Sequence, residues 1–234
     1  MTSEYHANPV FGNRVLGLFA KHPQQGQVKT RLAAETSPEW AAQVAMACLL
    51  DSVALLATVP ANRVLIFAPP DAAPFFDSIV KGRFALTPQI EGDLGQRMAA
   101  FMDEQFQAGA ARVVLVGSDC PQMPLEFLEQ AFQELASADV VLGPATDGGY
   151  YLIGCKRFVP ALFENIPWST RQVLHATLSR VQENGLRPAL LPLCFDVDTL
   201  DDWRVLKRHV AELRAAGVDP CVPNTEQLLN DSKP

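Results

Sequence analysis

The sequence of 234 residues lacks any paired-cysteine motif. Its cysteines do not form a C-x-x-C pattern anywhere; they are the scattered residues Cys48, Cys120, Cys155, Cys194 and Cys221. An odd and dispersed set of this kind indicates reduced thiols in a cytoplasmic protein and argues against a disulfide framework or a zinc site. Residues 1–6 also lack the basic and apolar pattern of a secretory leader, which agrees with a cytoplasmic location.

An excess of positive charge is missing as well. The formal net charge is -7, which argues against a general nucleic-acid binder, because such a protein normally presents a basic face. A phosphorylated small molecule stays possible as a ligand wherever lysine and arginine cluster locally. With 48% hydrophobic and 19% charged residues, the composition is that of a globular protein long enough for one large α/β domain.

No long apolar stretch is free of charge. The best candidate for a membrane span, residues 41–59, carries Asp51 near its middle. A central aspartate costs about 2.5–3.5 kcal/mol on membrane-insertion scales, so a span is unfavourable. The stretch is better interpreted as a helix buried between a sheet and other elements, and we expect no membrane span.

The two common glycine-rich phosphate motifs, G-x-x-x-x-G-K-[ST] and G-x-G-x-x-G, are also absent. What is present is a basic loop at residues 20–32, directly after the first predicted strand. Gly26 would let the backbone approach a ligand, while Lys29 and Arg31 supply charge suited to phosphate oxygens. The alternative is a solvated basic loop without a ligand.

Predicted strands and helices alternate along the chain. Helix starts are signalled by Ser37 with Pro38, by a capping-box-like Ser169–Gln172 and by Thr199, and Gly109 is a fitting helix end. This alternation predicts right-handed crossovers and one α/β domain with a mainly parallel sheet and helices on both faces. Residues 1–13 and 219–234 are expected to be loose tails. The predicted strands are 14–20, 64–67, 84–86, 112–116, 138–142 and 150–154, and the helices start near 38, 94, 125, 169 and 199.

Three aspartates follow apolar runs at predicted turns: Asp119, Asp147 and Asp198. In an open α/β sheet, ligands bind outside the carboxyl ends of the strands, and carboxylates there are suited to a hard divalent cation. Aspartate is also common in turns for purely structural reasons, so any single one of them carries little weight. As a set, they predict one cleft lined by all three carboxylates.

Several motifs occur in order along most of the chain. They are Lys21 to Leu32, Gly92-Asp93-Leu94-Gly95-Gln96-Arg97-Met98, Gly117-Ser118-Asp119-Cys120-Pro121, Gly143 to Gly154, Trp168-Ser169-Thr170 and Asp196-Val197-Asp198-Thr199. Together they resemble a bacterial glycosyltransferase-like family once catalogued as a domain of unknown function. That family is related to nucleotide-diphospho-sugar transferases of the GT-A fold, a Rossmann-like three-layer α/β/α arrangement, and some of its members are named arsenosugar-biosynthesis glycosyltransferases.

The resemblance implies a nucleotide site. The loop with Lys21, Gly26, Lys29 and Arg31 corresponds to the phosphate cradle of the family. Asp93 and Arg97 correspond to a turn beside the nucleotide.

The resemblance also implies a metal site with catalytic roles. Asp119 and Asp198 would hold a divalent cation, Mg²⁺ or Mn²⁺, and Asp147 would face the acceptor and act on its hydroxyl. The neighbours of Asp119 are Ser118 and Cys120, so the D-x-D motif of glycosyltransferases is missing there. This departure brings the site closer to nucleotidyltransferases.

Three functions therefore remain open. The first is a metal-dependent glycosyltransferase that uses a nucleotide sugar and a small-molecule acceptor. The second is a nucleotidyltransferase that releases pyrophosphate from a nucleoside triphosphate; the string Lys29-Thr30-Arg31-Leu32 resembles phospholactate guanylyltransferases. The third is a non-catalytic nucleotide-binding module, which the three intact carboxylates disfavour. A nucleic-acid partner is not expected, and a homo-oligomer is possible.

Overall fold

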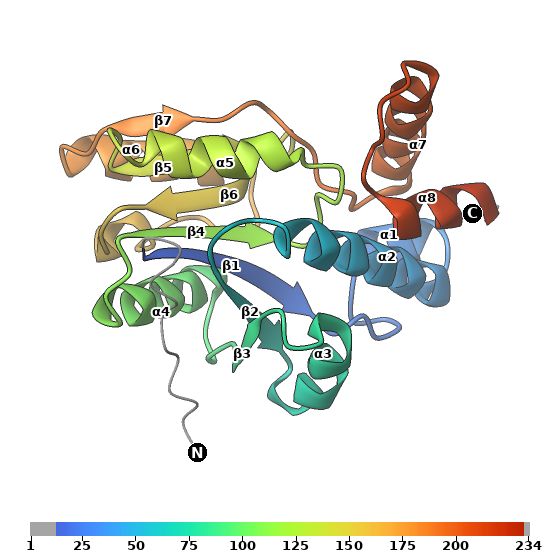
Figure 1. Cartoon of the computed structure of the whole chain (residues 1–234), viewed down its shortest axis with the longest axis horizontal. Helices are drawn as coiled ribbons and strands as arrows, with labels where there is room; N and C mark the ends of the chain where they lie inside the picture. Colours follow the sequence, from blue (N-terminus) through green and yellow to red (C-terminus); the bar gives the residue numbers. More distant parts are fainter. Residues whose placement is uncertain (1–12, 232–234) are drawn as a thin grey trace.

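The computed structural model describes residues 13–231, which form one α/β domain around a seven-stranded sheet of order β3-β2-β1-β4-β6-β5-β7 (Figure 1). The sheet is parallel except for β6, which runs antiparallel to both of its neighbours, β4 and β5. The predicted α/β fold with a mainly parallel sheet is thus confirmed. The strands are β1 (Arg14–Lys21), β2 (Asn62–Ala68), β3 (Ala85–Pro88), β4 (Arg112–Gly117), β5 (Val140–Pro144), β6 (Tyr150–Cys155) and β7 (Pro188–Leu190).

Helices cover both faces of the sheet, and a further group lies beyond the carboxyl end of β1 (Figure 1). Ser37 and Thr199 cap their helices through side-chain hydrogen bonds, as the sequence predicts. The elements α1, α3 and β7 are short, and the sequence analysis did not find them. The helices are α1 (Thr30–Glu35), α2 (Pro38–Leu56), α3 (Ala73–Val80), α4 (Leu94–Gln107), α5 (Leu125–Glu134), α6 (Val173–Glu183), α7 (Leu200–Ala215) and α8 (Pro223–Asp231), with 3₁₀ turns η2 (Pro70–Ala72) and η3 (Pro160–Leu162).

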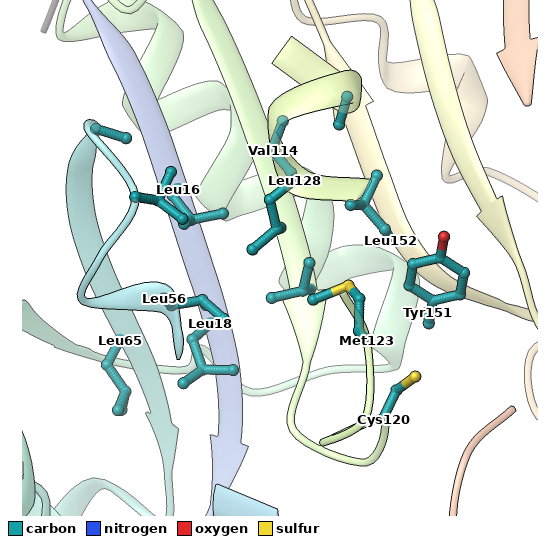
Figure 2. Close-up of a cluster of buried hydrophobic side chains, with 14 of the residues drawn as sticks. Leu16, Leu18, Leu56, Leu65, Val114, Cys120, Met123, Leu128, Tyr151 and Leu152 are labelled. Carbon is teal, nitrogen blue, oxygen red and sulfur yellow. The ribbon is translucent and has the colours of Figure 1, made fainter. Parts of the chain in front are cut away.

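Two apolar layers hold the helices against the sheet. Successive residues of β1 alternate between them, because side chains of a strand point to opposite faces. Leu16 and Leu18 pack in the layer formed with α2, α3 and α5, which Figure 2 shows in part. Val15 packs in the opposite layer, together with Met102 of α4 and Val181 of α6. The sheet is therefore the middle layer of a three-layer fold.

The apolar helix α2 is long and hydrophobic enough to cross a membrane by length and composition alone, but 61% of that stretch is buried within the protein. Its Asp51 is fully buried and accepts hydrogen bonds from the backbone N–H groups of Asn224 (3.0 Å) and Thr225 (2.8 Å) and from the Asn224 side chain (2.7 Å). The carboxylate therefore caps the first turn of α8 from a neighbouring helix. The prediction of a buried helix is confirmed.

Two local expectations are wrong. The segment from residue 219 is not a loose tail, because α8 packs against α2 with Val222 and Leu229 buried; residues 232–234 and 1–12 lie outside the described residues. The Ser169–Gln172 stretch is not a capping box. Thr170 instead closes a tight turn, accepting from the N–H of Gln172 (3.2 Å), and α6 begins only at Val173.

Candidate functional site

A cavity of about 420 Å³ opens at the carboxyl ends of β1 and β4. This volume is in the range of small-molecule sites, which is about 300–1,000 Å³. The strand order explains its place. From β1 the chain proceeds to β2 and β3 on one side, and then returns to β4 on the other side of β1. Such a reversal between adjacent parallel strands leaves a crevice, and it is where open α/β sheets bind ligands.

Lys29 is the buried cation of this site. Its Nζ lies 2.6 Å from Oδ1 of Asp119 and 3.7 Å from Oδ1 of Asp198, and it donates to the carbonyl oxygen of Val197 (2.6 Å). Only 2% of its side chain is exposed. Burial alone would lower the pKa of Lys29, but the negative charges of Asp119 and Asp198 raise it above its ordinary value. The ammonium group therefore stays charged and neutralises part of the carboxylate cluster.

The backbone at Lys29 is strained. Its φ is 44°, in the left-handed region that non-glycine residues rarely adopt. This conformation turns the side chain away from the solvent and into the carboxylates, at a cost of about 1–3 kcal/mol. The alternative of a solvated basic loop does not hold for Lys29, because its charge faces Asp119 and Asp198.

The two predicted metal ligands, Asp119 and Asp198, both line the cavity. Asp119 follows β4 and keeps half of its side chain exposed, whereas the side chain of Asp198, in the segment between β7 and α7, is 25% exposed. Burial and the charge of Asp119 raise the pKa of Asp198. The fold thus brings together two carboxylates from turns 79 residues apart in sequence (198 minus 119).

Asp196 is a site residue that the sequence analysis did not single out. It lines the same cavity, and burial together with the charges of Asp119, Asp198 and Asp147 raises its pKa to about 8. The signal was in the sequence, because Asp196-Val197-Asp198 is itself a D-x-D pattern. In an extended segment, two residues at this spacing point to the same side, which explains why both reach the cavity.

Asp147 lies close enough to the cluster for its charge to help raise the pKa of Asp196 but, among the described residues, does not form part of the cavity wall. Its Oδ1 accepts from the N–H of Gly149 (2.8 Å), a hydrogen bond that shapes its own turn. Gly148 has a φ of 91°, and a Cβ there would meet the backbone of Arg171 at 2.3 Å. The turn is therefore fixed, and the expectation that all three predicted carboxylates line one cleft is correct for only two of them.

The other residues of the predicted phosphate loop lie in different places relative to the cavity. Lys21 lines the cavity and donates to the carbonyl oxygen of Gln27 (2.7 Å). Gly26 has a φ of 72° with open space around its Cα, so the backbone is accessible there. Arg31 is 63% exposed and pairs with Asp198 at the edge of the site.

Asp93 and Arg97 have structural partners. Asp93 caps α4 in a reciprocal capping box with Gln96. Arg97 donates to the carbonyl oxygen of Gly92 (3.0 Å) and to Oε1 of Gln89 (3.1 Å). Gln89 lines the cavity, whereas Asp93 and Arg97 are not among the lining residues in the described part of the chain. Asp93 therefore supports α4, and Arg97 supports Gln89, but neither side chain lines the cavity itself.

Part of the cavity lining is apolar. It includes Phe19 of β1, Leu94 and Met98 of α4, and Tyr150 of β6. Trp168 packs behind this wall, with its ring centroid 6.5 Å from that of Tyr150. A cavity lined by both charged and apolar side chains is suited to a ligand that has both phosphates and a ring.

The family model described as "Uncharacterized protein conserved in bacteria (DUF2064)" matches residues 49–170. This chain belongs to that bacterial family, and the resemblance found in the sequence is confirmed. No curated protein matches the chain in a sequence comparison.

Solved structures share the fold. A candidate nucleotide-diphospho-sugar transferase from Desulfovibrio desulfuricans G20 is 32% identical, with a TM-score of 0.83 over 93% of this chain and 97% of that one. A cytidylyltransferase from Leptospira borgpetersenii is 14% identical, with a TM-score of 0.57 over 94% of each chain. A CMP:2-keto-3-deoxy-manno-octonic acid synthetase complexed with CTP is 13% identical, with a TM-score of 0.52 over 88% of this chain and 99% of that one. The last two show the fold alone.

Proposed function

We propose that this protein is a metal-dependent transferase acting on a nucleotide-diphosphate ligand, and that it transfers a glycosyl group from a nucleotide sugar to a small acceptor. The observation that carries the proposal is the charge arrangement of the cavity: Lys29, Asp119 and Asp198 meet at the switch point between β1 and β4. The name of the Desulfovibrio desulfuricans protein, which is 32% identical, supports a nucleotide-diphospho-sugar as the donor.

The carboxylate oxygens of the site fit a divalent cation that is also held by the phosphates of the bound nucleotide. Within residues 13–231, no three His, Cys, Asp or Glu side chains gather into a ready-made metal cluster. Mg²⁺ is usually bound by one or two carboxylates together with substrate phosphates, and Asp119 and Asp198 supply such a pair. Burial, together with the charges of the neighbouring aspartates, raises the pKa values of Asp196 and Asp198, and a bound cation would favour their charged forms. When bound, the cation would neutralise charge that develops on the diphosphate leaving group.

The residues of the chain have separate roles in this proposal. Lys29 keeps its charge in a buried position, and Lys21 stands at the mouth of the cavity, so both would attract the diphosphate. The apolar side with Leu94 and Met98 would hold the ring of the nucleoside or the sugar. Asp147, which has a fixed turn next to the carboxylates, would orient or deprotonate the acceptor hydroxyl.

Nucleotidyl transfer is the second candidate. It is favoured by the sequence around Asp119, where Ser118 and Cys120 replace the D-x-D pattern of glycosyltransferases. Both reactions break a bond to a phosphate-bearing leaving group and need the same neutralisation of charge. They differ in the product released: a nucleoside diphosphate in glycosyl transfer and pyrophosphate in nucleotidyl transfer.

A ligand and product screen tests the proposal. The protein is titrated calorimetrically with nucleotide sugars and nucleoside triphosphates, with Mg²⁺, with Mn²⁺ and with a chelator. Any ligand that binds is then incubated with a mixture of small sugars and alcohols, and the released product is identified. We expect cation-dependent binding of a nucleotide sugar and slow release of a nucleoside diphosphate. Pyrophosphate release would replace the first candidate by the second, binding without turnover would indicate a non-catalytic module, and absence of binding would refute all three.

A further inference from the structure

Two buried thiols face one another directly behind the carboxylates. Cys120 follows Asp119 in the turn after β4, and Cys194 lies two residues before Asp196. Their Sγ atoms are 2.7 Å apart, although the residues are separated by 74 positions in sequence. Cys120 is 5% exposed and Cys194 is 8% exposed, and Figure 2 shows Cys120 at the tip of the turn. A disulfide bond needs about 2.05 Å between the sulfurs, so closure requires a movement of less than an ångström.

The backbone holds both thiols in place. Cys194 exchanges hydrogen bonds with the end of β5, donating from its N–H to the carbonyl oxygen of Pro144 (3.0 Å) and accepting from the N–H of Thr146 (3.0 Å). The two turns are also joined directly, because the N–H of Val197 donates to the carbonyl oxygen of Asp119 (2.9 Å). Backbone hydrogen bonds between these segments therefore keep the two sulfurs close together.

Gln122 gives the pair a polar neighbour. Its Nε2 donates to Cys194 Sγ (3.7 Å) and to the carbonyl oxygen of Phe195 (2.6 Å). Its Oε1 is buried and has no hydrogen-bond partner among the described residues. Buried amide oxygens are rarely left without a donor, and the O–H group of an oxidised sulfur at Cys194 would supply one. The N–H group of the same amide would stabilise negative charge on that sulfur.

We propose that Cys120 and Cys194 form a redox-active pair that closes into a disulfide when it reacts with hydrogen peroxide. The Cys194 thiolate attacks one peroxide oxygen, so that an S–O bond forms, the O–O bond breaks and hydroxide leaves as water after protonation. The Cys120 sulfur then attacks the sulfenic sulfur, so that the S–S bond forms, the S–O bond breaks and a second water leaves. Two thiols lose two electrons in total, and one peroxide is reduced to two waters.

The disulfide would tie together the two segments that carry the site. Asp119 is adjacent to Cys120, while Asp196 and Asp198 follow Cys194 closely. The reduced protein holds these segments against the repulsion of their carboxylates only by non-covalent contacts, including the Val197–Asp119 hydrogen bond. The covalent link therefore fixes the spacing of the carboxylates, and it does so whichever reaction the site performs.

Thiol counting and peptide mapping test this pairing. The experiment uses Cys221→Ser, because Cys221 is the exposed thiol and would react with peroxide by itself. The five cysteines of the chain minus Cys221 leave four thiols. After treatment with hydrogen peroxide, we expect two thiols in the denatured protein, a mass lower by two hydrogens, and one cross-linked peptide joining Cys120 to Cys194. A dithiol reductant should restore all four.

Three variants in the same background serve as comparison. Cys155→Ser removes a buried thiol outside the pair and should still lose two thiols on oxidation. Cys120→Ser and Cys194→Ser should each lose the cross-link. Retention of four thiols, a cross-link between other cysteines, or over-oxidation of Cys194 without a cross-link would overturn the proposal, and the peptide map of the Cys221→Ser protein alone decides this if a variant fails to fold.

Hydrogen exchange tests the link between the two segments. The amide of Val197 donates across them, so its exchange reports their separation. We expect exchange at Val197 to be at least several-fold slower in the oxidised Cys221→Ser protein than in the reduced protein. Equal exchange rates in the two forms, with the disulfide present, would overturn the inferred effect on the site.

Discussion

The Lys29 ammonium group lies between the carboxylates of Asp119 and Asp198, 2.6 Å from the first and 3.7 Å from the second. It occupies a position where a cation is required, because the two carboxylates repel each other when nothing lies between them. Arg31, two residues later, pairs with the outer side of Asp198 and stays exposed. The two basic residues of one loop therefore contribute in different ways, and the difference is measurable.

Lys29→Ala should destabilise the protein by about 1–3 kcal/mol, because it removes the buried counter-ion between Asp119 and Asp198 and leaves only the exposed Arg31 beside them. Arg31→Ala should cost less than about 1 kcal/mol, since exposed ion pairs contribute little. Urea denaturation of the two variants and the wild-type protein checks both values. Equal and small losses would show that the Lys29 contacts add nothing to the stability of the fold.

Asp119→Asn should abolish the dependence of nucleotide binding on a divalent cation. The amide removes one of the two charges proposed to hold the ion, and loss of a preorganised stabilising group typically lowers the rate by about 10²–10³. Calorimetric titration in excess Mg²⁺ and in excess chelator gives the result directly. Asp201→Asn is the matched control, because Asp201 is an exposed aspartate on the first turn of α7 and should bind nucleotide like the wild-type protein.

Wild-type binding that is equally strong in Mg²⁺ and in chelator would contradict the metal assignment. Asp119 would then act through Lys29 alone, and the Lys29→Ala variant should lose as much affinity as Asp119→Asn.

Asp51→Ala should destabilise the protein by about 2–4 kcal/mol. Three hydrogen bonds from Asn224 and Thr225 end on this buried carboxylate, and their donors would lose their acceptor. The loss should appear first in α8, which would exchange its amides faster than the sheet. Thermal melting and hydrogen exchange measure the two effects, and normal protection of α8 in the variant would refute the capping role.

Asp139 should make the stability of the folded protein depend on pH in the acidic range. Its carboxylate accepts hydrogen bonds from Lys156 (2.9 Å) and from the N–H of Arg187 (2.8 Å), which lower its pKa to about 2. A carboxyl group with a lowered pKa in the folded state stabilises the fold above its ordinary pKa of about 4, and the contribution is lost as the pH falls through about 2. Asp139→Asn should therefore cost about 1 kcal/mol at pH 7.

The same variant should differ less and less from the wild-type protein as the pH falls below 4. Denaturation curves at pH 7, 4 and 2.5 follow the difference. A difference that is unchanged at the lowest pH would show that the carboxylate charge has no part in holding the start of β5.

Most of the helices and strands could be predicted from the sequence, because they depend on interactions between neighbouring residues. Ser37 before Pro38 and Thr199 before its helix act through hydrogen bonds within one turn, so they can be recognised without the fold. Strands buried on both faces appear as apolar runs, and their alternation with helices predicts a mainly parallel sheet. The aspartates that follow β4 and β7 were found for the same reason, because each ends an apolar stretch.

The tertiary structure alone decided what these residues contact. Lys29 has a left-handed backbone conformation, and its ammonium group contacts Asp119 and Asp198, which lie far along the chain. Residues 223–231 fold as α8 with their first N–H groups satisfied by Asp51 of another helix. The meeting of Cys120 and Cys194 depends in the same way on the strand order. Interactions within a turn can be deduced from neighbouring residues, whereas the contacts that complete this site join segments that only the packed sheet brings together.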